Sequence, residues 1–208
     1  MTVRVAVIDS GIHADHPHVG GVAGGVCIRR GGETAEYQDT LGHGTAVAGA
    51  IREKAPDAAL YAVKVFDQSL AANVDAILRA IDWAIEQRMD VINLSLGTHN
   101  QDHRERFEQV MARAAAARVI VVSALEQDSR PLLPGSLEGV IAVGLDWDCP
   151  RDTYRVERRN GRSIYCASGF PRPAPGVPPE RNLNGISFAV ANVTGLLARE
   201  LGRSHSNH

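Results

Sequence analysis

Val3-Arg4-Val5-Ala6-Val7-Ile8-Asp9 is an almost unbroken apolar run that ends in a carboxylate. A run this short is typical of a strand buried on both faces, as in a parallel sheet covered by helices. Similar runs alternate with helix-like segments along the chain. The other expected strands are residues 59–65, 90–94, 119–123 and 140–144, and the expected helices are residues 46–52, 73–87, 103–117 and 187–201. This alternation predicts a three-layer α/β/α fold with a mainly parallel central sheet.

The composition is that of a single globular domain. Hydrophobic residues make up 44% of the 208 residues and charged residues 22%, near the average for folded proteins. We expect one domain over residues 1–203 and a disordered tail over residues 204–208. No apolar run approaches the roughly 18 residues that a membrane span needs, so no membrane partner is expected.

The formal net charge of −2 creates no strong field of one sign. Nucleic acids and anionic lipids attract concentrated positive charge, and we expect neither as a partner. One segment, residues 146–162, is arginine-rich and is predicted to form an exposed hairpin. Its residues 151–162 either bind an acidic partner or leader peptide, or form an ordinary solvated hairpin.

Cysteine usage points to a reducing compartment. The chain holds three cysteines without a CxxC spacing, and no signal peptide precedes the first strand. A cytoplasmic location therefore fits best. A bridge between Cys149 and Cys166 is conceivable but is not the favoured arrangement. Residues 169–181 hold five prolines and must form an irregular surface loop.

Three polar residues stand where a predicted strand or loop meets the next element. Asp9 ends the first strand, His43 lies in Gly42-His43-Gly44-Thr45, and Ser187 follows Asn184-Gly185-Ile186. Open α/β sheets place their sites at such junctions. Taken singly, each residue is more simply read as a turn, a structural histidine or a helix cap.

Together, the order Asp, His, Ser resembles that of the subtilisin-like serine peptidases, or subtilases. Matches also lie between and after these motifs, so the resemblance covers about residues 3–201. The further matching segments are Leu60–Val65, Ile81–Ile85, Met89–Gly97, Val140–Gly144 and Ala191–Gly195. The resemblance implies the subtilisin-like α/β/α fold and a serine endopeptidase.

The resemblance also assigns roles to residues. It makes Ser187 the nucleophile, His43 the general base, and Asp9 the group that orients the imidazole. It gives the Ser187 backbone N–H a place in the oxyanion hole. The substrate-binding residues would be Ser95, Leu96, Gly97 and Ala124. An extended peptide would add a strand along residues 95–97, although an ordinary strand end needs no substrate.

The sequence departs from the family at the oxyanion hole. Subtilases usually carry an Asn after the valine-rich strand, whereas Val121–Gln127 has none. Counting from the strand places Gln127 at that point, or Glu126 if the register shifts by one. An amide can donate to an oxyanion, but an ionised carboxylate cannot. Glu126 beside the pocket for the residue before the scissile bond would instead favour a basic side chain there.

A second departure follows the nucleophile, where Ala191-Asn192 replaces the usual Pro-His. Loss of the proline restores a helix hydrogen bond and, by moving Ser187, would permit acyl transfer to an amine. Simple tolerance of alanine in a helix is the plainer interpretation.

No cofactor is expected, and no acidic loop resembles a calcium site. Asp15, His16 and Asp39 could hold a cation, although solvated loop residues are the default interpretation. Likewise, the two histidines of residues 204–208 are more simply part of a frayed end than metal ligands.

The sequence thus favours a cytoplasmic endopeptidase of narrow specificity that acts on a peptide or precursor peptide. We expect no inhibitory prodomain before the first strand, and an unrestrained protease would be hazardous in the cytoplasm. The alternatives are a peptide-binding module with impaired catalysis, and a transpeptidase or macrocyclase. The sequence does not indicate an oligomeric state.

Overall fold

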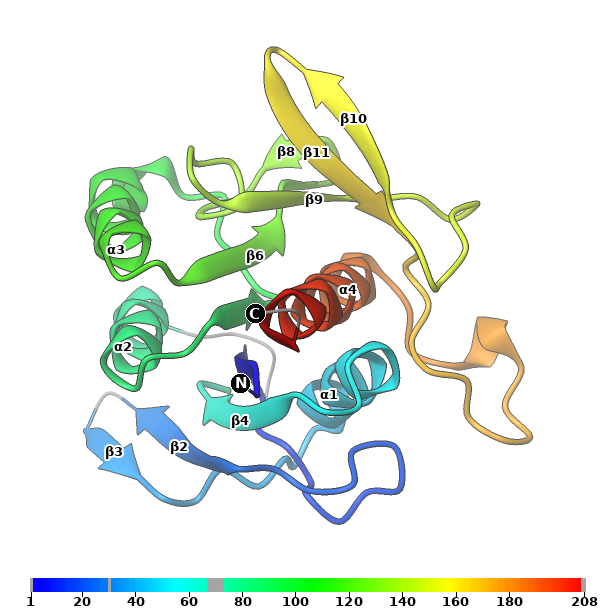
Figure 1. Ribbon diagram of the computed structural model, residues 1–208. Coiled ribbons are helices and arrows are strands. Elements are labelled where there is room, and N and C mark those ends of the chain that lie inside the picture. The colour runs from blue at the N-terminus through cyan, green and yellow to red at the C-terminus, as the bar shows by residue number, and fades with distance from the viewer. Residues whose placement is uncertain (1, 30, 67–72, 207–208) are drawn as a thin grey trace.

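The first strand lies inside a nine-stranded sheet in the computed structural model, which describes residues 2–29, 31–66 and 73–206 (Figure 1). The strand order is β10-β11-β9-β6-β5-β1-β4-β2-β3, and all neighbours are parallel except the pairs β10–β11 and β2–β3. The strands are β1 (Arg4–Asp9), β2 (Gly24–Arg29), β3 (Gly32–Thr34), β4 (Ala59–Lys64), β5 (Val91–Leu94), β6 (Ile120–Ala124), β9 (Ile141–Leu145), β10 (Arg155–Arg159) and β11 (Arg162–Ala167). A separate two-stranded sheet pairs β7 (Glu126–Gln127) with β8 (Arg130–Pro131).

Two helices cover each face of the main sheet (Figure 1). The helices are α1 (His43–Lys54), α2 (Val74–Glu86), α3 (Arg104–Ala116) and α4 (Ile186–Ser206), with short 3-10 turns at Gln101–His103 and Pro179–Arg181. The helices α1 and α4 pack together on one face, and α2 and α3 pack together on the other. The chain therefore has the predicted three-layer architecture.

Alternation along β1 divides the core between these two layers. Val5 and Val7 belong to the cluster beneath α1 and α4, whereas Ala6 and Ile8 belong to the cluster beneath α2 and α3. All four side chains are fully buried. Successive side chains of a strand point to opposite faces, so an unbroken apolar run supplies both layers at once.

The predicted strands and helices are all present, with ends that differ by a few residues. The sequence analysis missed β2 and β3, because β2 begins with two glycines and β3 has only three residues. The tail was predicted to be disordered from residue 204, but α4 continues to Ser206. The Ser204 hydroxyl donates to the Glu200 carbonyl there. Residues 207–208 lie outside the described residues.

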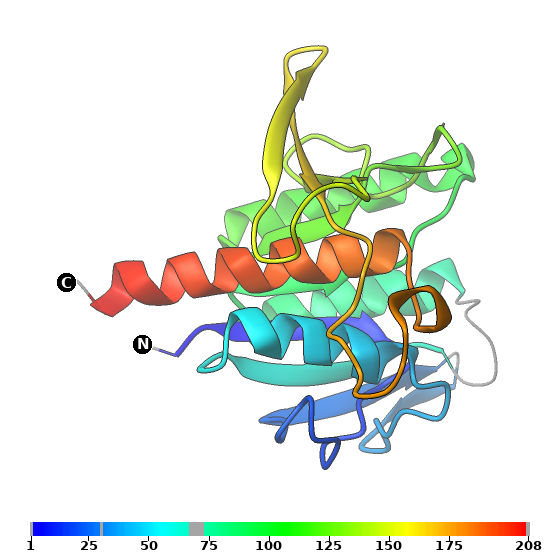
Figure 2. The same cartoon turned by 90° about the vertical axis from the view of Figure 1, so that its right-hand side faces the viewer.

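The arginine-rich hairpin also lies elsewhere than predicted. It comprises β10 and β11, residues 155–167, instead of residues 146–162, because β11 joins the main sheet beside β9. The hairpin projects from the body of the domain (Figure 2). Every residue of β10 is exposed, as expected of a solvated edge strand.

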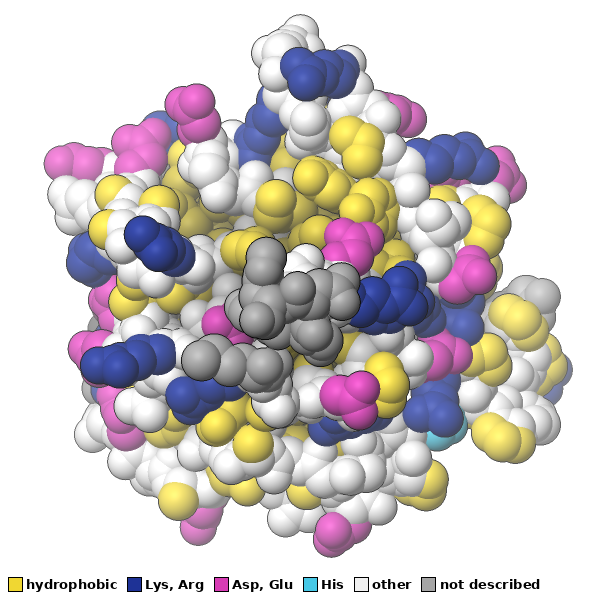
Figure 3. Space-filling view, in the orientation of Figure 1, with side chains coloured by type: hydrophobic (Ala, Val, Ile, Leu, Met, Phe, Trp, Pro, Cys, Tyr) yellow, Lys and Arg dark blue, Asp and Glu magenta, His cyan; other side chains and the backbone are white. Residues whose placement is uncertain are grey.

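The surface charge, the cysteines and the apolar character of the helices can also be compared with the sequence analysis. Positive and negative side chains are interspersed on the face shown in Figure 3, in keeping with a net charge of −2. Cys149 and Cys166 are free and buried, as is Cys27, so the conceivable bridge is not formed. Among the described helices, none combines the length and the apolar character needed to cross a membrane.

Candidate active site

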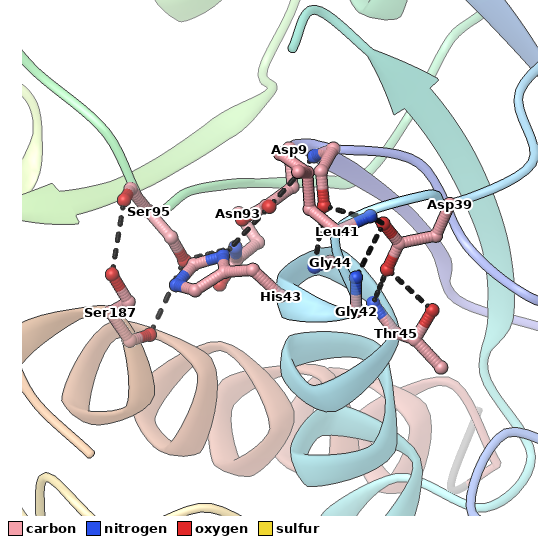
Figure 4. Close-up of polar contacts among 11 residues, drawn as sticks. Asp9, Asp39, Leu41, Gly42, His43, Gly44, Thr45, Asn93, Ser95 and Ser187 are labelled. Atoms are coloured by element: carbon pink, nitrogen blue, oxygen red, sulfur yellow. Dashed lines mark hydrogen bonds and ion pairs between the residues drawn. The ribbon is translucent and has the colours of Figure 1, made fainter. Parts of the chain in front are cut away.

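Asp9 ends β1 with its carboxylate completely buried. Its Oδ1 accepts hydrogen bonds from the Ser10 backbone N–H at 2.7 Å and from His43 Nδ1 at 2.8 Å (Figure 4). Its Oδ2 has no hydrogen-bond partner among the described residues. A buried anion needs compensation, and here His43 supplies it from a different element.

His43 is the first residue of α1, and the glycines on both sides of it fit the chain around Asp9. A Cβ at Gly44 would lie 2.2 Å from the Gly11 carbonyl oxygen and 3.1 Å from the Asp9 Cβ. Gly42 has a φ of 83°, in the left-handed region that favours glycine. The Gly-His-Gly sequence therefore allows the imidazole to approach the end of β1.

Asp39 fixes the turn that leads into this helix. Its Oδ1 accepts from the Ser10 hydroxyl and from the backbone N–H groups of Leu41 and Gly42, each at 2.9 Å. Its Oδ2 accepts from the backbone N–H and the hydroxyl of Thr45. The helix has no side-chain cap at Gly42, so Asp39 satisfies its first donors in that place.

These bonds correct the interpretation of Asp39 as a solvated loop residue or a cation ligand. They also lower its pKa: burial acts to raise it, but the bonds from Thr45, Leu41 and Gly42 outweigh burial. Within the described residues, no group of three His, Cys, Asp or Glu side chains is arranged to hold a metal ion.

The imidazole of His43 is mostly enclosed, with 14% of its side chain exposed. Burial acts to lower its pKa, but the hydrogen bond and the charge of Asp9 and the charge of Asp39 raise the pKa above its ordinary value of 6.5. The neighbouring carboxylates therefore stabilise the imidazolium.

Ser187 lies at the start of α4, on the other side of the imidazole from Asp9 (Figure 4). The ring of the next residue, Phe188, has its centroid 5.7 Å from that of His43. The Ser187 Oγ donates to the Ser95 carbonyl oxygen at 3.2 Å, and the Ser95 Oγ donates to the Ser187 carbonyl oxygen at 3.3 Å. In the described part of the chain, no hydrogen bond joins His43 to Ser187.

Buried hydrogen bonds connect Ser95 to β5 and to α4 through Asn93 and Thr194. Asn93 Nδ2 donates to the Ser95 Oγ at 2.8 Å, and the Thr194 hydroxyl donates to Asn93 Oδ1 at 3.0 Å. Asn93 and Thr194 are fully buried. The sequence analysis did not assign them a role, although a polar residue inside the apolar run Val91–Leu94 is a signal that could have found Asn93.

The segment that follows β5 keeps main-chain groups free beside Ser187. Thr98 forms an antiparallel bridge with Leu133, with bonds of 3.0 and 2.9 Å in the two directions. Over the described residues, Leu96 and Gly97 form no main-chain hydrogen bond. This free edge has the chemistry that strand addition requires. Ala124, in contrast, is 3% exposed and its methyl group belongs to the core.

The comparisons with known proteins agree with this arrangement. The sequence profile described as the subtilase family, peptidase S8, matches residues 1–204. The chain belongs to the subtilase family. It is 34% identical over 226 residues both to subtilisin of Bacillus pumilus and to subtilisin E of Bacillus subtilis (strain 168). Each alignment covers 97% of this chain, but 77% of the first relative and 56% of the second.

Solved structures extend the comparison to the fold. A crystal structure of a lanthipeptide protease has a TM-score of 0.74 at 22% identity, covering 99% of this chain and 74% of that one. The prenylagaramide maturation protease PagA has the same TM-score at 26% identity, covering 99% of this chain and 76% of its own. The predicted family and fold are thereby confirmed, and the protein is a serine endopeptidase by its relationship to the subtilisins.

The subtilase carries both candidate oxyanion residues on β7. Glu126 accepts from Arg159 Nη1 at 3.3 Å, so its charge is paired with the projecting hairpin. Gln127 lies opposite Arg130 and is exposed. Neighbouring side chains of a strand point to opposite sides, so Gln127 points away from the side on which Glu126 meets Arg159. Its role at the oxyanion stays a prediction.

Asn192 has a structural use in this subtilase. Its Nδ2 donates to the carbonyl oxygens of Ser168 at 2.9 Å and Phe170 at 3.1 Å. These carbonyls lie at the root of the proline-rich loop, which Gly185 closes by donating to the Gly169 carbonyl at 2.8 Å. The residue that departs from the family thus ties this loop to α4, the helix that carries Ser187.

Proposed function

We propose that Asp9, His43 and Ser187 form the catalytic triad of this subtilase and that it hydrolyses peptide bonds in a precursor or leader peptide. The observation that carries the proposal is the 2.8 Å bond between Asp9 and His43, formed beside the start of α4. A buried carboxylate bonded to one imidazole nitrogen leaves the other nitrogen for a hydroxyl. Ser187 carries a hydroxyl at the start of α4, on the side of the imidazole away from Asp9 (Figure 4).

The chemistry begins with a rotation of Ser187. Its Oγ leaves the Ser95 carbonyl and turns to His43 Nε2, which accepts the proton as the Oγ attacks the peptide carbonyl. Asp9 stabilises the imidazolium that forms. The imidazolium then gives the proton to the leaving amine, and water hydrolyses the acyl-enzyme by the same steps.

The start of α4 supplies the environment for the oxyanion. The first N–H groups of a helix lack intrahelical partners, and the helix dipole favours negative charge there. Ser187 is the second residue of α4, so its backbone N–H is one donor. The amide of Gln127 is the second donor in our proposal. Removing one such donor costs about 3–4 kcal/mol of transition-state stabilisation.

The peptide before the scissile bond would bind as an added strand along Leu96 and Gly97. Their free main-chain groups support this placement. Action on a precursor is supported by the likeness to PagA, described as a maturation protease. The three free, buried cysteines fit a reducing compartment, and we propose that the protein acts in the cytoplasm.

The test is labelling with a fluorophosphonate probe, followed by intact mass. The wild-type protein should gain one adduct on Ser187, Ser187→Ala should gain none, and His43→Ala should react far more slowly. Ser204→Ala, which changes a serine at the far end of the same helix, should label normally. Absence of labelling across a range of pH would overturn the triad and leave a peptide-binding module.

The same preparation separates hydrolysis from acyl transfer. Cleavage of a peptide library in the presence of excess glycinamide should give products with a free carboxylate at the new C-terminus. Predominant amide products would replace hydrolysis with transpeptidation as the function.

A further inference from the structure

A second groove opens over the first turn of α1, the helix that begins with His43. It has a volume of about 510 Å³ and runs between residues 13–18 and the proline-rich loop. Its walls carry His13, His16, His18, Pro171, Arg172 and Pro175, and its floor is the first turn of α1. The loop crosses the start of α1 in Figure 2. We call the groove between residues 13–18 and the proline-rich loop the leaving-side groove.

The strand order shows which part of a substrate would reach this groove. Across the sheet, β6 and β5 lie to one side of β1, so residues 95–97 lie to one side of Asp9 and His43. On the other side of β1 lie β4 and β2, and residues 13–18 belong to the connection from β1 to β2. A peptide that lies along residues 95–97 before the scissile bond and crosses the site would continue toward this groove after that bond.

The groove is built from well-anchored walls. Arg172 Nη1 donates to the His18 carbonyl oxygen at 3.1 Å and so joins one wall to the other. The His13 backbone N–H donates to the Thr45 hydroxyl at 3.0 Å, which ties residues 13–18 to α1. The loop is fixed at its root by Asn192 and closed by Gly185. Its prolines further restrict the backbone.

The polar groups that face the groove are mainly donors. The Arg172 guanidinium is always charged and, among the described residues, forms no ion pair. His16 Nδ1 accepts from the His18 backbone N–H at 3.2 Å. The neutral His16 ring therefore carries its proton on Nε2 and offers a donor.

Two carboxylates near the groove, those of Asp39 and Glu53, are already engaged, whereas Asp15 lines a different hollow. Asp39 lies in the lining, but five hydrogen bonds from its surroundings occupy both oxygens. Glu53, whose charge acts on His18, is paired with Lys54 and Arg151. Burial and the positive charge of Arg172 lower the pKa of His18.

We propose that the leaving-side groove holds the substrate segment that follows the scissile bond, and that Arg172 and the imidazoles of His16 and His18 select an acidic side chain in that segment. This inference rests on the proposed function, because it assigns a substrate preference to the same site. The planar guanidinium is suited to a carboxylate, which can accept two hydrogen bonds from it.

The first experiment maps preference with a peptide library. Cleaved bonds are identified by mass spectrometry, and the best substrate is remade as pairs with Glu or Gln at each of the three positions after the bond. We expect kcat/KM to be about tenfold higher for Glu at one of these positions. Arg172→Gln should lower kcat/KM more for the Glu peptide than for the Gln peptide and so remove most of that difference. Arg172→Lys should keep part of the difference in kcat/KM between the Glu and Gln peptides. Arg158→Gln, a control on the exposed strand β10, should keep all of that difference.

A second experiment is independent of turnover. Ser187→Ala protein is titrated with the capped peptides Ala-Glu-Gly and Ala-Gln-Gly, and the imidazole resonances of His16 and His18 are followed by NMR. The Glu peptide should bind about fivefold more tightly and shift both imidazoles. Equal binding would overturn the proposal even if the fluorophosphonate labels Ser187. Failure of labelling with retained Glu preference would overturn the catalytic role alone.

Equal loss of activity toward both peptides of a pair in Arg172→Gln would also overturn the selective role. Arg172 would then only position the loop through the His18 carbonyl.

Discussion

The Ser187 hydroxyl donates to the Ser95 carbonyl oxygen at 3.2 Å, and the Ser95 hydroxyl returns a bond of 3.3 Å to the Ser187 carbonyl oxygen. This reciprocal pair joins the start of α4 to the segment along which the substrate is proposed to lie. Substrate binding and nucleophile orientation therefore share one pair of residues. A peptide that lies along residues 96–97 would compete for space beside the hydroxyl and favour its rotation to His43.

The first prediction concerns the buried chain below Ser95. Asn93→Ala leaves the Thr194 hydroxyl without its acceptor and frees the Ser95 hydroxyl. We expect the free energy of unfolding to fall by about 1–3 kcal/mol and fluorophosphonate labelling of Ser187 to slow. Chemical denaturation and labelling rates measure the two effects.

Thr194→Val provides the matched control for this prediction. In the double variant both partners are absent, so the total loss should be smaller than the sum of the two single losses. Strict additivity would contradict the coupling.

The second prediction concerns pH. Burial alone would lower the pKa of His43, but Asp9 and Asp39 raise it above 6.5. A general base must be neutral, so kcat/KM should rise with pH through a midpoint above 6.5. Asp9→Asn should lower that midpoint and reduce kcat by about 10⁴-fold, because the imidazole loses its anion and its orienting acceptor.

NMR of the His43 imidazole in Ser187→Ala protein measures this pKa without turnover. A pKa that did not fall in the Asp9→Asn, Ser187→Ala double variant would show that Asp9 is not its cause.

The third prediction concerns Asp39, whose folded pKa lies below its ordinary value of 3.8. The stabilisation from its carboxylate is therefore fully present above pH 3.8 and is lost as the pH falls through the folded pKa. At neutral pH, Asp39→Asn should lower the free energy of unfolding by about 1–3 kcal/mol. The difference from wild type should shrink in strong acid.

Urea denaturation across pH 2–7 would test the Asp39 prediction, with the exposed Asp15→Asn as the control that should change little. A pH-independent difference would contradict the assigned cause.

Local patterns were enough to predict the parallel strands and the helices over them, since buried runs such as Val3–Ile8 show their type without knowledge of their partners. The glycines on both sides of His43 are visible in the sequence, and the structure shows that Gly44 allows close packing on Asp9. The catalytic role of His43 stays a prediction. Pairing distant in sequence could not be predicted. The placement of β11 beside β9 depends on register, and nothing within Arg162–Ala167 states its neighbour.

Side-chain bonds between distant segments were equally hidden. Asp39 accepts from Ser10, which lies 29 residues away. Its other four bonds come from residues 41–45 and are local, but the sequence analysis interpreted Asp39 as a solvated residue and did not use that pattern. Asn192 was noticed as a departure from the family, but its acceptors lie more than twenty residues away. The sequence therefore identified Asn192 as unusual but did not identify its hydrogen-bond acceptors.

The last prediction concerns the hydrogen bonds by which Asn192 joins α4 to the proline-rich loop. Asn192→Ala removes the side-chain donor to the Ser168 and Phe170 carbonyl oxygens. Both carbonyl oxygens then lack this hydrogen bond to α4. We expect a loss of about 1–3 kcal/mol in the free energy of unfolding and faster amide hydrogen exchange in residues 169–185. The conservative Asn192→Gln should restore little, because a longer side chain does not fit a fully buried site. Asn184→Ala, an exposed residue at the end of the same loop, is the control for exchange. If exchange in the loop were unchanged in Asn192→Ala, its rigidity would have to come from its prolines and the Gly185–Gly169 bond alone.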